Sequence, residues 1–176
     1  MIIHINGRAG VGKLTIGTIV AGLVGAKLLD NHSIYNVAFA LTEFRSERFF
    51  DTVRAVRDVA FQRVLDLPAA TPIILTNWYS VDSDWGNENW DAVISLARKR
   101  ASQLLVVVLE CSVEENARRI QSAERSAKRK PRDPATATTS AGRALLDRDG
   151  DRLLRLDVTE LSADAAARRI ADWVQQ

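Results

Sequence analysis

The sequence is poor in the residues on which several common kinds of protein depend. Its single cysteine, Cys111, cannot form an internal disulfide, and so sparse a use of thiols fits a reducing compartment such as the cytoplasm. Two histidines and one cysteine are too few to build a zinc site from these ligands. We therefore expect a cytoplasmic chain held together by its core, without disulfides or structural zinc.

Long apolar runs are also missing. Residues 14–26 are mostly apolar, but Lys27 and Asp30 end this run before the roughly 18 residues that are needed to cross a bilayer. The same run resembles the core of a secretory signal peptide, yet residues 1–6 are typical of a strand rather than of a short cationic leader. We expect neither a membrane segment nor a leader.

Charge of one sign is not in excess. The chain has 24 Lys and Arg residues against 22 Asp and Glu residues, a formal charge of +2. Proteins held to nucleic acid by charge usually have a large cationic surplus, so we expect no nucleic-acid partner, and any basic site must be local. With 47% hydrophobic residues the chain can bury one core, and we expect one domain over residues 1–176 that is a monomer or a homodimer.

Short apolar runs alternate with longer helical patterns along the chain. The expected strands are residues 2–6, 26–30, 72–78, 103–110 and 152–157. The expected helices are residues 13–24, 46–67, 89–101 and 162–174, and a further helix begins at Ser112. Strict alternation predicts parallel strands in a three-layer α/β/α sandwich, and the unbroken apolar run at 104–109 fits a strand buried on both faces.

A glycine-rich loop with a lysine follows the first expected strand. Its members are Gly7, Arg8, Ala9, Gly10, Val11, Gly12, Lys13, Leu14 and Thr15. Glycines let the backbone curl so that its N–H groups face one point, the following helix adds its positive N-terminal end, and Lys13 reaches the outer phosphates of a nucleotide. The spacing predicts a phosphate-binding loop, and a glycine-rich turn without a ligand is the alternative.

The pattern GxxGxGKxT after a first strand resembles the small P-loop kinases, which include adenylate kinase and shikimate kinase. Residues 1–13 (MIIHINGRAGVGK) look most similar to chloramphenicol phosphotransferase and to the tunicamycin-resistance proteins. This resemblance implies a P-loop NTPase fold of the nucleotide kinase-like kind, with a five-stranded parallel sheet. It also implies ATP and Mg²⁺ at the loop, and transfer of the γ-phosphoryl group to a small acceptor.

The loop departs from the usual motif at one position. Leu14 stands where a Ser or Thr usually follows the lysine and binds Mg²⁺, and the hydroxyl comes one residue later, at Thr15. The resemblance therefore implies a metal site at Thr15 and Asp30, through water, with the phosphates supplying further ligands.

Asp30 ends the second expected strand. Ligands of open parallel sheets lie beyond the carboxyl ends of the strands, so we expect Asp30 near the phosphate loop. A carboxylate there can accept the proton of an attacking hydroxyl, which is the role of the matching aspartate in shikimate kinase and chloramphenicol phosphotransferase. Lys13 and Asp30 are therefore expected catalytic residues, and a plain N-cap of the next helix is the alternative for Asp30.

The expected acceptor-binding helical segment covers about residues 31–70. Shikimate kinase-like proteins use an arginine of this region to hold an anionic substrate, a role that the resemblance gives to Arg54 or Arg57. The alternative is that both are surface charges paired with Asp51 or Asp58. The substrate-binding candidates are Asn31, His32, Arg54, Arg57, Asn77 and Trp78. For His32 the alternative is a helix-start residue, and for Trp78 it is a tryptophan that covers the core.

A basic segment precedes the last expected strand. In kinases of this type the segment is a lid that closes over ATP and places arginines against the transferring phosphate. The resemblance implies a lid over about residues 121–142, with Arg119, Arg125 and Arg132 as candidates and Arg125 as the expected catalytic residue. A nucleic-acid patch and a solvated run of charge are the alternatives.

These features predict an ATP- and Mg²⁺-dependent phosphotransferase, an enzyme that acts on a hydroxyl of a small molecule. Its expected partners are ATP and that acceptor. Three alternatives stay open: a nucleoside monophosphate kinase, an ATPase or nucleotide-binding switch without an acceptor, and, because of Leu14, a nucleotide binder without turnover.

Overall fold

The computed structural model describes residues 1–121 and 135–176, and its centre is a five-stranded sheet. All neighbouring strands are parallel, and their order across the sheet is β2-β3-β1-β4-β5. The strands are β1 (Ile2–Gly7), β2 (Lys27–Asp30), β3 (Ile73–Asn77), β4 (Leu104–Glu110) and β5 (Arg152–Asp157). The five expected strands are thus present, each within a residue or so of its expected ends.

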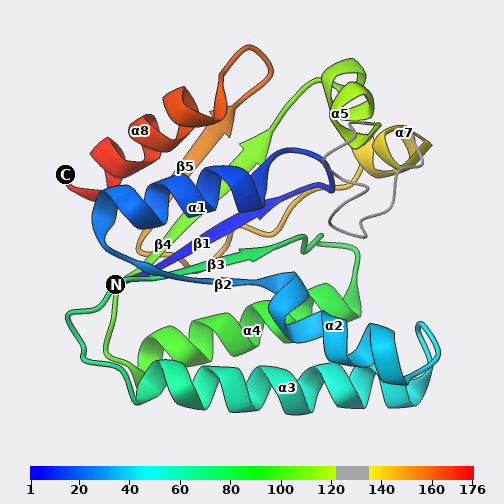
Figure 1. Ribbon diagram of the computed structural model, residues 1–176, viewed down its shortest axis with the longest axis vertical. Helices are drawn as coiled ribbons and strands as arrows, with labels where there is room; N and C mark the ends of the chain where they lie inside the picture. The colour runs from blue at the N-terminus through cyan, green and yellow to red at the C-terminus, as the bar shows by residue number, and fades with distance from the viewer. Residues whose placement is uncertain (122–134) are drawn as a thin grey trace.

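Helices cover both faces of this sheet (Figure 1). They are α1 (Lys13–Val24), α2 (Asn31–Leu41), α3 (Glu47–Leu65), α4 (Asp84–Lys99), α5 (Val113–Ile120), α7 (Ala135–Ala141) and α8 (Ala163–Val174). α1 and α8 lie on one face, α3 and α4 lie on the other, and α5 and α7 lie near the carboxyl ends of the strands. This arrangement confirms the predicted three-layer α/β/α sandwich.

Alternation along β1 sends its side chains into two of the cores, one on each face of the sheet. Ile3 and Ile5 pack against α1 and α8, in a cluster that also contains Val20 and Ile170. The intervening position, His4, points to the other face, where its ring meets Trp90 of α4 edge-on with 4.8 Å between ring centres. Successive side chains of a strand point to opposite faces, and both faces of β1 are buried, so its polar residues His4 and Asn6 are buried along with its isoleucines.

Serine side chains fix where four helices begin. Ser46, Ser83, Ser112 and Ser162 each accept a hydrogen bond from the backbone N–H three residues later. The cap at Ser112 matches the start that the sequence predicted for this helix. Ser83 starts α4 at Asp84, five residues before the expected start at residue 89, because the cap satisfies backbone N–H groups ahead of the apolar stripe.

α2 lies inside the expected helical segment 31–70 but does not follow the usual apolar periodicity. Its exposed side chains include Val37, Phe39 and Leu41, while Ile34 and Ala38 are buried. Apolar residues on both the buried and the exposed sides leave no single stripe, so hydrophobic spacing alone does not mark this helix.

The strand register brings the candidate residues to one edge of the sheet. Asn6 of β1 is paired with Asn77 of β3, and Asp30 of β2 is paired with Thr76 of β3. The phosphate loop, Asn77 and Asp30 therefore share the carboxyl edge, where open parallel sheets bind ligands. Within the described part of the chain, none of the helices is long and apolar enough to cross a membrane.

Candidate phosphate-binding and acceptor site

The loop between β1 and α1 has the backbone of a phosphate-binding loop. Gly10 and Gly12 have φ angles of 92° and 103°, a region that side chains other than glycine rarely adopt. A Cβ atom on Gly10 would also lie 2.6 Å from Cγ1 of Ile120. The ammonium group of Lys13 curls over the loop and donates to the carbonyl oxygens of Gly7 at 2.6 Å and Arg8 at 2.8 Å. The lysine is thus already held above the loop, where it can exchange carbonyl oxygens for phosphate oxygens.

Asn6 anchors the base of this loop. Its Oδ1 accepts hydrogen bonds from the N–H groups of Gly7 at 3.0 Å and Tyr79 at 2.9 Å. Its Nδ2 donates to the carbonyl oxygens of Tyr79 and Leu146, both at 2.8 Å. Since Asn6 is fully buried, these bonds are screened little by water, and they tie the start of the loop to the segments after β3 and before β5.

α5 supports the other side of the loop. Nδ2 of Asn116 donates to the carbonyl of Ala9 at 3.0 Å, and Arg119 donates to the carbonyl of Val11 at 3.1 Å. Arg119 also bonds the carbonyl of Val158 at 2.7 Å and Glu115 at 2.6 Å. The ion pairs with Arg118 and Arg119 lower the pKa of Glu115 to about 2. The structure therefore places Arg119 beside the phosphate loop, bound to its backbone.

Arg8 joins the phosphate loop to the end of α7. Its guanidinium donates to the carbonyl oxygens of Ser140, Ala141 and Arg143, each at 2.8 Å. The last carbonyl groups of a helix lack partners within the helix, so a cation at that position is favourable. Arg125 and Arg132, the other lid candidates, lie outside the described residues.

Asp30 caps α2 through one of its two carboxylate oxygens. Its Oδ1 accepts the N–H of His32 at 2.7 Å, which confirms the capping role that was the alternative in the sequence. The structure gives Oδ2 no hydrogen bond to any residue that it describes. β3 separates β2 from β1, so the backbones at Asp30 and Ile5 are about 10 Å apart, twice the usual strand spacing.

The residues present can complete an Mg²⁺ site only in part. Leu14 offers no oxygen, Thr15 is exposed on the first turn of α1, and Asp30 keeps one carboxylate oxygen. No group of three acidic, histidine or cysteine side chains suited to a metal occurs among the described residues. This donor set fits an ion that takes most of its ligands from nucleotide phosphates and water, as Mg²⁺ commonly does.

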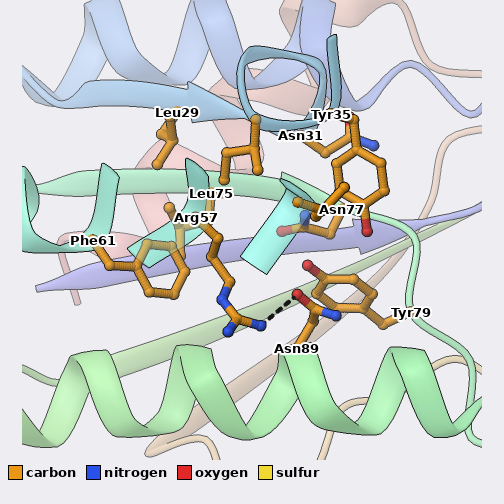
Figure 2. A pocket seen from close by; sticks show the side chains of 11 residues that line it. Leu29, Asn31, Tyr35, Arg57, Phe61, Leu75, Asn77, Tyr79 and Asn89 are labelled. Atoms are coloured by element: carbon orange, nitrogen blue, oxygen red, sulfur yellow. Dashed lines mark hydrogen bonds between the residues drawn. The ribbon is translucent and has the colours of Figure 1, made fainter. Parts of the chain in front are cut away.

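A small cavity lies beside this edge, between the sheet and the helices α2, α3 and α4 (Figure 2). Its polar lining residues are Asn31, Tyr35, Arg57, Asn77, Tyr79 and Asn89, and its apolar ones are Leu29, Ile34, Val53, Phe61 and Leu75. The cavity has only about 10 Å³ of space for the centre of a water molecule, close to the least that one water requires. A molecule larger than water does not fit this cavity in the conformation that the structure shows.

Three of the six substrate-binding candidates line this cavity, namely Asn31, Arg57 and Asn77. His32, Arg54 and Trp78 are not among its lining residues. His32 is the second residue of α2, and Trp78 is 36% exposed just beyond β3. Arg54 lies on the side of α3 that faces α4, with its guanidinium over the ring of Trp85 at 5.0 Å and bonded to Glu88.

His4, Tyr35, Glu88 and Asn89 were not site candidates in the sequence. Nε2 of His4 lies 3.0 Å from Oδ1 of Asn77, and burial lowers the pKa of His4 to about 4. Nδ1 of His4 has no hydrogen-bond partner within the described chain. There was one sequence signal for His4: it is a polar residue between isoleucines in an expected buried strand. The others come together only through the packing of α2, α3 and α4.

The chain matches no protein-family model and no curated protein. Solved structures share its fold. A protein from Chloroflexus aurantiacus J-10-fl, provisionally described as a kinase, has 19% identity and a TM-score of 0.70 over 99% of this chain and 95% of that chain. Shikimate kinase from Bacteroides thetaiotaomicron has 16% identity and a TM-score of 0.61 over 100% of this chain and 99% of that chain. A tunicamycin resistance protein from Deinococcus radiodurans has 17% identity and a TM-score of 0.60 over 98% of this chain and 94% of that chain.

These similarities extend over nearly the whole of each chain, and at such identities they establish the fold. They agree with the resemblance seen in the glycine-rich loop, which covers a small part of the sequence. The protein therefore has the α/β fold of the P-loop kinases, with its glycine-rich loop and Lys13 at the carboxyl edge of the parallel sheet.

Proposed function

We propose that this protein is an ATP- and Mg²⁺-dependent phosphotransferase that moves the γ-phosphoryl group to a hydroxyl of a small molecule. One observation carries the proposal: Gly10 and Gly12 hold the loop in a left-handed backbone directly before α1, with the Lys13 ammonium over it. Backbone N–H groups, a helix N-terminus and an ammonium group at one point are the combination that binds a polyphosphate. Kinases among its structural neighbours support the same reading.

Each residue has a defined part in this proposal. Lys13 leaves the carbonyl groups of Gly7 and Arg8 and binds the outer phosphates of ATP. Oδ2 of Asp30 accepts the proton of the acceptor hydroxyl while Oδ1 keeps its bond to His32 N–H, so the helix cap holds the carboxylate in position. Thr15 and Asp30 would hold Mg²⁺ through water, and a bound Mg²⁺ offsets charge on the phosphates.

The lid is part of the proposal as well. Residues 121–142 would close over ATP, with Arg125 next to the transferring phosphate and Arg132 as a further candidate. α7 ends this segment, and its bonds to Arg8 connect the lid to the phosphate loop. Arg119 is already bound to the loop backbone, which suits it to hold the loop's shape.

Asn77 weakens the alternative of an ATPase without an acceptor. An ATPase usually has a carboxylate at the tip of the strand beside the phosphate loop, where it binds Mg²⁺. Here an amide occupies that tip, paired in register with Asn6 and bonded to His4. The phosphate loop therefore lies next to a neutral strand end.

Nucleotide binding is tested first, by thermal unfolding with and without Mg-ATP. At 100 times the dissociation constant a ligand stabilises by about 2.7 kcal/mol, which raises the melting temperature of a domain of this size by about 5–10 °C. The Lys13→Ala variant should lose most of this shift. The exposed Lys99→Ala variant, which removes the same charge at the end of α4, should keep it.

Transfer is tested by ATP consumption over a panel of hydroxylated metabolites, nucleotides and antibiotics. Asp30→Asn and Asp30→Ser both keep a side-chain oxygen for the cap but lose the base, so each should lower turnover by about a hundredfold or more without unfolding α2. Normal turnover in both variants would reject Asp30 as the base. Nucleotide binding without stimulation by any acceptor would reject phosphotransfer in favour of a nucleotide-binding switch.

A further inference from the structure

The cavity beside Asp30 has one charged residue among the lining side chains that the structure describes, and that residue is Arg57. The side chain of Arg57 is 11% exposed, so its charge is largely shielded from water. A buried cation without partners would attract an anionic acceptor, which is what the resemblance to shikimate kinase implied for this arginine. The partners of Arg57 decide whether that attraction remains.

Those partners neutralise Arg57 from two sides. NH2 lies 3.1 Å from Oδ1 of Asp58, and NH1 lies 3.5 Å from Oε1 of Glu88. NH1 also donates to Oδ1 of Asn89 at 3.0 Å, the bond drawn in Figure 2. The guanidinium therefore already faces two carboxylates and an amide oxygen. An acceptor carboxylate or phosphate would have to displace them.

Arg54 is also satisfied, by the same glutamate. Its Nε and NH2 donate to the two carboxylate oxygens of Glu88, both at 2.8 Å, and NH1 donates to Asp51 at 2.9 Å. A bidentate guanidinium–carboxylate pair is among the strongest hydrogen-bonded arrangements in proteins. These bonds with Arg54 lower the pKa of Glu88, so the carboxylate is ionised at neutral pH.

The cluster as a whole is not cationic. It holds three carboxylates, from Asp51, Asp58 and Glu88, and two guanidinium groups, from Arg54 and Arg57, a formal charge of −1. This finding agrees with the sequence alternative in which both arginines pair with Asp51 or Asp58, and it adds Glu88, which bridges them.

The remaining polar lining is neutral. Asn31, Asn77 and Asn89 offer amides, and the hydroxyl groups of Tyr35 and Tyr79 stay protonated because burial raises their pKa. The Tyr35 hydroxyl oxygen accepts a hydrogen bond from the indole N–H of Trp85 at 2.9 Å. The hydroxyl can therefore still donate its own hydrogen to another group. Amides and hydroxyls that surround an apolar wall recognise hydroxyl groups without requiring a charge.

We infer that the acceptor is an uncharged, hydroxyl-bearing molecule, and that Glu88 excludes acids by neutralising Arg54 and Arg57. This inference rests on the proposed phosphotransfer. Acids are rejected for two reasons. Binding them would break the ion pairs of Arg57, and it would place their negative charge next to the carboxylate of Glu88. Uncharged acceptors leave every ion pair in place.

The test uses matched pairs of probes that differ by a charged group: sorbitol with gluconate, glucose with glucuronate, and adenosine with AMP. Binding is measured by calorimetry on the full chain saturated with Mg²⁺ and a non-hydrolysable ATP analogue, so that the phosphate loop is filled. Turnover of each probe with ATP is measured separately. In the wild type, the uncharged member of at least one pair should bind about tenfold more tightly than its acid.

Glu88→Gln supplies the decisive change, because it keeps the side chain's shape and removes the charge that the two arginines share. Affinity for the acid members should rise about tenfold, since close charge pairs that are partly shielded from water have about this effect. Asp58→Asn, which takes the other carboxylate from Arg57, should shift preference in the same direction by less. Asp66→Asn, which removes a carboxylate paired with Arg63 at the far end of α3, should change nothing.

Two results would overturn the inference: acids that bind the wild type as tightly as their uncharged partners, or a folded Glu88→Gln variant whose affinity for every acid is unchanged. Thermal unfolding of each variant establishes that it is folded. The proposed function fails separately, if uncharged probes bind with the predicted preference but none of them is phosphorylated. Turnover of acids by the wild type would leave phosphotransfer standing and remove the inference.

Discussion

Acid should destabilise this protein through His4, whose Nε2 lies 3.0 Å from Oδ1 of Asn77 at the edge of the cavity beside Asp30. His4 is fully buried between the ring of Tyr79, which stacks on it at 5.8 Å, and that of Trp90. Burial lowers its pKa from 6.5 to about 4. In the unfolded chain the imidazole takes up a proton as the pH falls through 6.5, whereas in the folded chain it stays neutral until about pH 4.

The size of the effect follows from that difference. The unfolded state binds more protons in this window, so stability falls as the pH falls from 6.5 towards 4. Between pH 7.5 and pH 5 the loss is about 2 kcal/mol, and it approaches about 3 kcal/mol below pH 4. About 2 kcal/mol corresponds to a fall of roughly 4–8 °C in melting temperature for a domain of this size.

Urea unfolding at pH 7.5 and at pH 5, followed by tryptophan fluorescence, measures this loss. Two variants isolate His4: His4→Gln keeps a donor for Asn77, and His4→Phe keeps the ring between Tyr79 and Trp90. Neither can take up the proton, so each should lose about 2 kcal/mol less than the wild type between the two pH values, whatever its stability at pH 7.5. A pH dependence equal to that of the wild type in both variants would refute the role of His4.

Two further predictions concern the phosphate loop. Gly10→Ala puts a Cβ into a backbone with φ 92° and 2.6 Å from Ile120, so it should destabilise by about 2–4 kcal/mol and abolish the Mg-ATP shift in thermal unfolding. Gly22→Ala is its matched control, since nothing lies within 4 Å of a Cβ in the middle of α1, and it should stabilise by about 0.5–1 kcal/mol. Arg8→Ala removes three hydrogen bonds to the end of α7, so amide exchange there should speed up about tenfold or more; unchanged exchange would mean that Arg8 does not hold α7.

Patterns of residues close together in the sequence explain most of the elements that could be predicted. The phosphate loop is encoded by nearby residues, because Gly10, Gly12 and Lys13 create their geometry within one turn of chain. The clearest strand was β4, since a parallel strand buried on both faces is apolar almost without interruption. Ser112 marked the start of α5 because its side chain caps a backbone N–H only three residues later.

Local patterns failed where the structure depends on packing across the chain. α2 exposes Phe39 and Leu41 as well as burying Ile34, so its spacing gave no helical stripe. The start of α4 was misplaced because its first turn is set by the cap at Ser83 and not by the apolar residues that follow.

What the sequence determined by itself is the α/β alternation, the glycine-rich loop before α1 and the position of Asp30 at a strand end, because each of these depends on residues close together in the chain. Only the tertiary structure decided which charges meet beside the cavity that Arg57 lines. Arg54 and Arg57 meet Glu88 across 31 residues or more, where α3 packs against α4. An arginine's charge is visible in a sequence, but whether that charge is free or neutralised depends on which carboxylate the fold places beside it.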